Sequence, residues 1–168
     1  MDLTIILEKV YQKLVQEIAE ANVENRIDEV LKKYGLQDEV EYPYYDIANS
    51  KILVVGDSAI SKDMLVNIAR KYGIKENRIE FELDYTRLTN YNFSKLRNSM
   101  VYSDVLVGPM PHKVEGIEGF SSFLAMTEAN PEEFPKIIKL ESSNELKITK
   151  NTFINGLLET RLYNDLYS

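Results

Sequence analysis

Among its 168 residues the chain has no cysteine and a single histidine. Without cysteine there are no disulfide bonds and no thiolate metal sites, and one histidine cannot build a site of several histidine ligands. The composition therefore excludes these two kinds of metal site. Asp57 and Asp84 could hold Mg²⁺, but two acidic residues are not a specific pattern, so we predict no metal site, and no residue pattern in the sequence identifies a cofactor.

Long apolar runs are also missing, since none approaches the roughly 20 residues that a membrane-spanning helix needs. The N-terminus carries Asp2 and lacks the basic n-region of a signal peptide. From these two absences we expect a cytoplasmic protein with no membrane partner.

Basic residues are in the minority, because 20 Lys and Arg stand against 27 Asp and Glu and leave a formal net charge of −7. A general nucleic-acid binder usually carries a basic face, and no comparable cluster occurs here. We therefore expect no general nucleic-acid binding.

Hydrophobic residues make up 44% of the chain, which is enough for one globular domain with an apolar core.

The stretch Lys51–Ser61 (KILVVGDSAIS) organises the rest of the chain. Its continuous apolar run predicts a strand that is buried on both faces. Gly56 then permits a tight turn, and Ser61 can cap a helix that runs to about Tyr72 and ends at Gly73. The stretch therefore predicts a strand, a turn and a helix in succession.

Further strands and helices are predicted to alternate after this unit. Arg78–Leu83 alternates polar and apolar residues, as an edge strand with one wet face does. The other predicted strands are 104–107, 136–140 and, more weakly, 145–149, and the predicted helices lie around 93–100, 123–126 and 151–167. This order predicts an α/β fold, a three-layer αβα sandwich of Rossmann-like or flavodoxin-like type. Right-handed crossovers give its parallel sheet of four or five strands the order 2-1-3-4.

Residues 2–34 carry a helical apolar stripe, so the chain is predicted to divide into a helical extension at 1–36 and an α/β domain at 50–168. One unbroken helix would be about 50 Å long, whereas a compact chain of this size has a radius of gyration of about 15 Å. Either the helix breaks near Asn22–Asn25 and packs on its own domain, or it projects and forms a homodimer. Tyr42–Tyr45 (YPYY) is predicted to be a lid over the core edge or a stacking platform.

In parallel sheets, ligands bind beyond the carboxyl ends of the strands, where the connections diverge to opposite faces. The sequence predicts a small-molecule site there, for a nucleotide-like or phosphorylated ligand. Backbone N–H groups at a helix N-terminus can hold the anion, and Asp84 can accept hydrogen bonds from ribose. Simpler roles also fit, because Gly56 can be a turn glycine and Asp84 a helix cap. The predicted ligand-binding residues are Gly56, Asp57, Ser58, Asp84, Gly108, Pro109, His112, Lys113 and Ser121.

A second hypothesis is a hydrolase, in which His112 activates Ser58 and an aspartate orients the histidine. The Gly-Asp-Ser of Gly56–Ser58 resembles the opening block of the SGNH, or GDSL-type, hydrolases. This resemblance implies a nucleophilic role for Ser58. The family's Gly-x-Asn-Asp block and late Asp-x-x-His are absent from the chain. The residues thus leave open whether a ligand is turned over.

A third hypothesis involves no chemistry. The domain can be an interaction or regulatory module whose working surface is the N-terminal amphipathic helix, bound to a partner protein or to a second copy.

Overall fold

A computed structural model describes residues 2–24, 26–36, 47 and 49–168. Its main sheet has four parallel strands in the order β2-β1-β3-β4. The strands are β1 (Lys51–Val55), β2 (Ile79–Glu82), β3 (Tyr102–Val107) and β4 (Lys136–Lys139). Both the strand order and the α/β class predicted from the sequence are confirmed.

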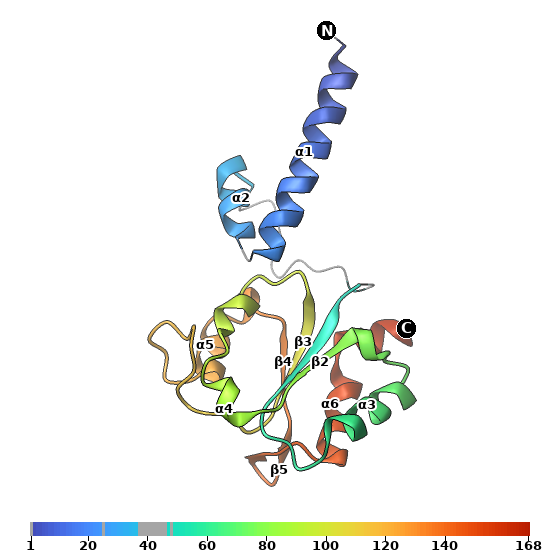
Figure 1. The fold of residues 1–168 in the computed structure, drawn as a ribbon, viewed down its shortest axis with the longest axis vertical. Helices are drawn as coiled ribbons and strands as arrows, with labels where there is room; N and C mark the ends of the chain where they lie inside the picture. The colour runs from blue at the N-terminus through green and yellow to red at the C-terminus, as the bar shows by residue number, and fades with distance from the viewer. Residues whose placement is uncertain (1, 25, 37–46, 48) are drawn as a thin grey trace.

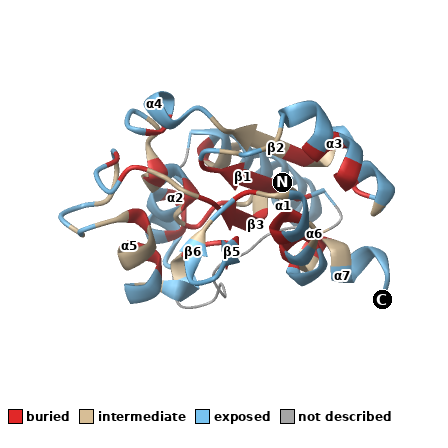
Figure 2. Cartoon of the chain, turned by 90° about the horizontal axis from the view of Figure 1, so that it is seen from below, coloured by how far each residue is buried: buried red, intermediate tan, exposed pale blue. Residues whose placement is uncertain are grey.

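Helices cover both faces of the sheet, which gives the predicted three layers (Figure 1). One face carries α3 (Lys62–Lys71), α6 (Lys150–Glu159) and α7 (Arg161–Leu166). The other face carries α4 (Tyr85–Leu88), the 3-10 helix η2 (Phe93–Leu96) and α5 (Phe123–Ala129). Figure 2 shows that buried residues are concentrated in β1 and β3, the two central strands.

The unit built on β1 follows the sequence closely. The Ser61 side chain accepts a hydrogen bond from the Met64 N–H at 3.3 Å and so caps α3. Gly73 has a φ of 81°, and the Ile74 N–H donates to the Ala69 carbonyl at 3.0 Å. A glycine in the left-handed region followed by a buried apolar residue is a common helix ending.

The predicted helix at 151–167 is divided into α6 and α7 at Thr160. Asp104, a buried residue of β3, accepts hydrogen bonds from the N–H groups of Arg161 at 2.7 Å and Leu162 at 3.2 Å. Thr160 itself caps α7 through the Tyr163 N–H. A new helix N-terminus therefore forms where the carboxylate meets the chain.

Two other predicted elements are shorter than expected. The helix predicted around 93–100 is the single 3-10 turn η2, preceded by the short α4. The weak fifth strand does not join the main sheet, because β6 (Glu145–Leu146) pairs with β5 (Glu141–Ser142) in a separate hairpin. The remaining elements are the 3-10 helices η1 (Glu76–Arg78) and η3 (Pro131–Glu133).

The N-terminal region forms two helices, α1 (Leu3–Val23) and α2 (Ile27–Tyr34), so the helical stripe breaks between them. The pair lies at the amino-terminal end of the strands, and α1 projects away from the sheet (Figure 1). The Asn98 side chain donates to the Asp28 carboxylate at 2.8 Å and joins α2 to the domain. No described helix is long and apolar enough to cross a membrane. The predicted lid Tyr42–Tyr45 lies outside the described residues.

Candidate functional site

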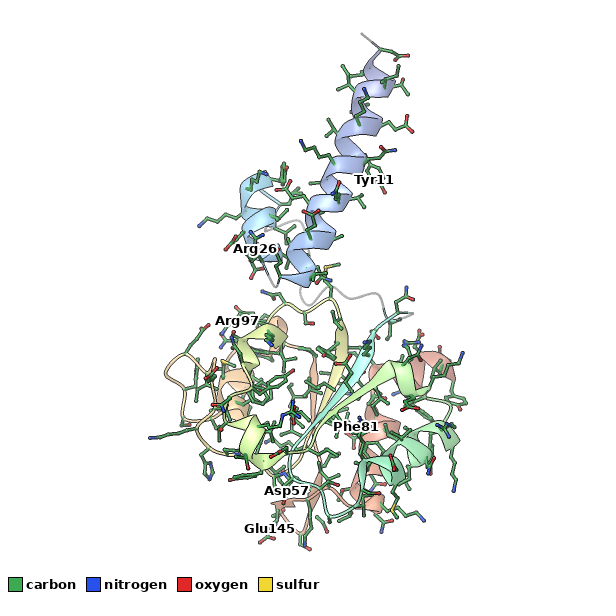
Figure 3. The ribbon with its side chains drawn as sticks, viewed as in Figure 1. Tyr11, Arg26, Asp57, Phe81, Arg97 and Glu145 are labelled. Atoms are coloured by element: carbon green, nitrogen blue, oxygen red, sulfur yellow. The ribbon has the colours of Figure 1, made fainter. Side chains whose placement is uncertain are left out.

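The predicted residues at the ends of β1 and β3 lie side by side. A side chain at Gly56 would come within 2.7 Å of the Gly108 backbone, so both strand ends need glycine to approach this closely. The Asp57 N–H donates to the Pro109 carbonyl at 2.7 Å. Figure 3 shows Asp57 at the end of the sheet opposite to α1. The two loops thus meet at the carboxyl edge.

The backbone donors of the β1–α3 turn are largely used within the protein. The Gly56 N–H donates to Glu82 and the Ala59 N–H to Ile148, both at 3.1 Å. Ile148 also forms a parallel bridge with Ser58, and its side chain occupies the space where a side chain at Gly108 would lie. The crevice between the ends of β1 and β3 is therefore filled by the segment that follows the β5–β6 hairpin.

The serine and the histidine of the hydrolase hypothesis are not hydrogen-bonded to each other. The Ser58 hydroxyl donates to the Ile60 carbonyl at 2.6 Å and accepts from the Ile60 N–H at 3.2 Å. His112 is exposed and has no hydrogen-bond partner within the described residues. Ser58 is thus engaged in a local turn, whereas His112 faces solvent.

The other predicted residues have local roles or are exposed. The Asp84 carboxylate caps α4, accepting from the N–H groups of Thr86 at 2.9 Å and Arg87 at 3.3 Å. Lys113 and Ser121 are exposed, and the neighbouring Ser122 caps α5. In the ranges described, no group of three or more His, Cys, Asp or Glu residues could hold a metal ion.

A cavity of about 470 Å³ lies over β1 and β2 on the α4–α5 side of the sheet. It exists because β2 alternates, so that Ile79 and Phe81 pack toward α3 and α6 while Glu80 and Glu82 face the opposite side. Figure 3 shows Phe81 at the centre of the domain. The lining residues used below are Leu53, Glu80, Glu82, Tyr91, Lys95 and Tyr102, and the end of α1 contributes Asn22 and Val23.

Glu80 is held by one partner from β1 and one from β3. The Lys51 ammonium donates to the Glu80 carboxylate at 2.6 Å, and the Tyr102 hydroxyl donates to its other oxygen. Burial raises the pKa of Glu80, but these two hydrogen bonds outweigh burial and bring the pKa below its usual value. Burial and the bond to Glu80 also raise the pKa of Tyr102. Glu80 is therefore an ionised, structurally engaged carboxylate.

Glu82 is less engaged, although its side chain is only 18% exposed. Its described side-chain partner is Arg87, whose guanidinium lies 3.7 Å away and is itself 74% exposed. A surface ion pair of this kind contributes little. The carboxylate therefore retains acceptor capacity at the cavity wall.

Tyr91 supplies a donor beside these acceptors. Burial, followed by the carboxylates of Glu80 and Glu82, raises the pKa of Tyr91 to about 12, so its hydroxyl stays protonated at neutral pH. The hydroxyl has no hydrogen-bond partner in the part of the chain that the structure describes. Among the described residues, the buried side-chain atoms without a partner are Arg97 Nε and Asn98 Oδ1, so the Tyr91 hydroxyl oxygen reaches solvent and can donate to a ligand atom.

Lys95 adds a positive charge to the same wall. Its ammonium lies 5.7 Å from the centre of the Tyr91 ring, within the range of a cation–π contact. The residue is exposed, and no ion pair of Lys95 occurs among the described residues. The cavity thus combines aromatic surface, a hydroxyl donor, carboxylate acceptors and one cation.

The cavity residues were not among those predicted from the sequence, although part of the signal is present there. The alternation in Arg78–Leu83 already puts Glu80 and Glu82 on one face of an edge strand. Tyr91 and Tyr102 come from separate elements, and only the fold brings them to these carboxylates.

Comparisons with known proteins find one distant similarity. No family model matches the chain, and the search of solved structures found no match either. Among curated proteins, the chain is 23% identical over 94 residues to the methylenetetrahydrofolate–tRNA-(uracil-5-)-methyltransferase TrmFO of Mycoplasmopsis agalactiae. The match covers 55% of this chain and 21% of the relative, so the chain corresponds to about a fifth of that protein's length.

Proposed function

We propose that this chain binds a nucleotide-like small molecule in the cavity over β1 and β2. The observation that carries the proposal is the pairing of Glu82 and Tyr91 in one cavity wall. There a largely buried carboxylate and a partly buried hydroxyl have few or no protein partners. The cavity volume of about 470 Å³ is within the range of small-molecule sites.

Each lining group has a counterpart in such a ligand. An acidic residue at the end of the second strand of a Rossmann-like sheet commonly accepts hydrogen bonds from ribose hydroxyls, and Glu82 stands at that position. The Tyr91 hydroxyl can donate to a base or sugar oxygen, and the two tyrosines offer aromatic surface to a flat base. Lys95 is the cation available to a phosphate.

The proposal keeps the ligand class predicted from the sequence and moves its centre from the carboxyl edge to the cavity, which reaches toward the amino-terminal end of β3 at Ser99 and Val101. The residues Gly56–Ser58 at the carboxyl edge do not line this cavity. The engagement of Ser58 with Ile60 favours binding over hydrolysis at this edge.

The distant relative supports nucleotides as the first probes. Its name states that it acts with methylenetetrahydrofolate on a uracil in tRNA. A uracil nucleotide and a folate are therefore the natural members of a screen that also contains adenine nucleotides, a flavin and a sugar phosphate.

A thermal-shift screen of the purified chain tests the proposal. A ligand at a hundred times its dissociation constant stabilises the folded state by about 2.7 kcal/mol, equivalent to roughly 5–10 °C in a chain of this size. We expect a shift with a nucleotide, and we expect Glu82→Gln and Tyr91→Phe to reduce it. Glu132→Gln is the matched control, because Glu132 is exposed in η3 and remote from the cavity lining.

Two results would contradict the proposal. One is the absence of any shift across the screen. The other is a ligand-induced shift in melting temperature that is the same in Glu82→Gln, Tyr91→Phe and the control Glu132→Gln.

A further inference from the structure

The N-terminal half of α1 projects from the molecule (Figure 1). Its surface carries exposed apolar side chains. Leu3, Leu7, Val10 and Tyr11 are 66%, 59%, 58% and 68% exposed, respectively. Contiguous exposed apolar surface commonly marks an interaction site.

These side chains continue a stripe that is covered further along the same helix. Helical geometry puts Leu3, Leu7, Val10, Leu14 and Ala21 on one narrow face. Ala21 is buried and Leu14 is half-buried, whereas the residues before them are exposed. One continuous apolar face is therefore half covered and half open.

The length of α2 explains where the cover stops. α2 has 8 residues and α1 has 21, so at 1.5 Å per residue α2 spans about 12 Å of a helix about 31 Å long. At the end of α2, Lys33 and Tyr34 hydrogen bond to Glu17 at 2.6 and 2.7 Å. Beyond Leu14, toward the N-terminus, the residues of the stripe are exposed.

We propose that a second copy of this chain covers the open stripe, with the two α1 helices antiparallel about a two-fold axis. In the register in which paired residue numbers add up to 17, Leu3 meets Leu14 of the second copy and Leu7 meets Val10 of the second copy. The two-fold axis repeats both contacts. Ile6 and Tyr11, which flank the stripe, lie level with each other in the same register.

The charges fit this register. A cavity of about 420 Å³ lies beside the end of α2, with Val10 and Leu14 in its lining. Its charged lining residues are Lys13, Lys33 and Glu17, and Lys33 is paired with Glu17, so Lys13 is the cation used here. The pairing brings the first turn of the second copy to this cavity. Asp2 of the second copy then lies on the same flank as Lys13 of the first copy, no more than about one helical turn away along the axis. Opposite charges therefore meet.

A parallel pair would not fit. It would bring both α2 helices and both α/β domains to the same end of the pair, whereas the antiparallel pair keeps the domains at opposite ends.

Sedimentation equilibrium of the full chain over a concentration series tests the pairing. We expect a species of twice the chain mass of 19.4 kDa, and we expect Leu7→Lys combined with Val10→Lys to return it to a single chain mass. Ile5→Lys is the matched control, because Ile5 is 51% exposed but lies on the opposite face of α1, and this variant should stay dimeric. Because the side chains are already exposed, circular dichroism and urea unfolding should show folded protein in every variant.

The direction of the pair is tested by spin labels at Glu20→Cys, which is unique because the chain has no cysteine. In the antiparallel register the two labelled positions lie 23 residues apart along the axis, or about 35 Å. A parallel pair would keep them level, with about 10 Å between the helix axes.

Several outcomes would overturn the proposal. They are a wild-type chain that stays monomeric, a dimer that survives Leu7→Lys with Val10→Lys, and a short label distance. A monomer whose α1 instead binds phosphatidylglycerol vesicles, and loses that binding in the same variant, would assign the stripe to a membrane surface.

Discussion

The two faces of the sheet are built differently. On the α3–α6 side, side chains such as Leu65, Leu106 and Phe153 are fully buried and form an uninterrupted apolar core. On the α4–α5 side, the core is apolar below α5 but gives way over β2 to a cavity with Glu80, Glu82 and tyrosines. The closed α3–α6 face is apolar core throughout, whereas the open α4–α5 face combines apolar core with the cavity proposed for a ligand.

The difference arises from the length of the covering helices. α3 and α6 have 10 residues each, whereas α4 and η2 have 4 residues each. A single turn cannot cover two strands, so part of β1 and β2 is left without a helix. Because β2 alternates polar and apolar residues, its polar side faces the uncovered region.

The largest expected effect is on the closed face. Phe153→Ala removes a fully buried ring that packs against Phe81, and we expect a loss of about 3–5 kcal/mol in the free energy of unfolding. Urea denaturation measures it. If Phe153→Ala lowered the free energy of unfolding by less than a substitution in the cavity wall does, the contrast between the two faces would be wrong.

Removing the carboxylate of Asp104 should have the next largest effect. The carboxylate oxygens of Asp104 accept hydrogen bonds from the N-terminal N–H groups of α7. They also accept one from the Ser103 hydroxyl at 2.6 Å. For Asp104→Ala we expect a loss of about 3 kcal/mol, because buried N–H donors lose their partner. Asp104→Asn keeps an acceptor and should lose less. Equal losses for the two variants would contradict a capping role.

The open face should respond to alkaline pH. The folded-state pKa of Tyr91, raised by burial and by Glu80 and Glu82 to about 12, exceeds the usual value of 10.0. The unfolded chain therefore loses this proton first, and the stabilisation, complete below pH 10, is lost as the pH rises toward 12. Tyr91→Phe should reduce this alkaline loss in urea denaturation series. A loss of the same size in the variant would show that Tyr91 does not contribute.

The smallest stability effects are expected for the groups assigned to the ligand. At neutral pH, Tyr91→Phe and Glu82→Gln should each change the free energy of unfolding by no more than about 0.5–1 kcal/mol, because neither group has a strong partner in the protein. Thermal denaturation without ligand measures this. A loss of several kcal/mol would make these groups structural and would remove the contrast between the faces.

Much of the fold follows from local patterns. Each local signal lies next to the element that it predicts. The apolar run predicted β1, Ser61 predicted the start of α3, and Gly73 predicted the end of that helix. The division of the last helix could not be predicted in this way, because the carboxylate that causes it lies 57 residues from Arg161.

The site shows the same limit. The loops at the carboxyl edge are brought together as the strand order implies, and Asp57 and Pro109 are hydrogen-bonded. The filling of that edge by Ile148 depends on a segment after β6 that the apolar pattern assigned to a fifth strand. α4 and η2, whose shortness opens the cavity, begin at local caps, Asp84 and Asn92, but the apolar spacing around 93–100 predicted a longer helix than the structure has.

The most direct test of ligand binding on the open face is a chemical-shift map. The ¹H–¹⁵N spectrum of the chain is recorded with increasing amounts of the nucleotide that stabilises it most. We predict that the amide signals of Leu53, Glu80, Glu82, Tyr91 and Tyr102 move together, while those of α3 and α6 change little. Changes confined to α3 and α6, or to the exposed loop around His112 and Lys113, would contradict binding in the cavity.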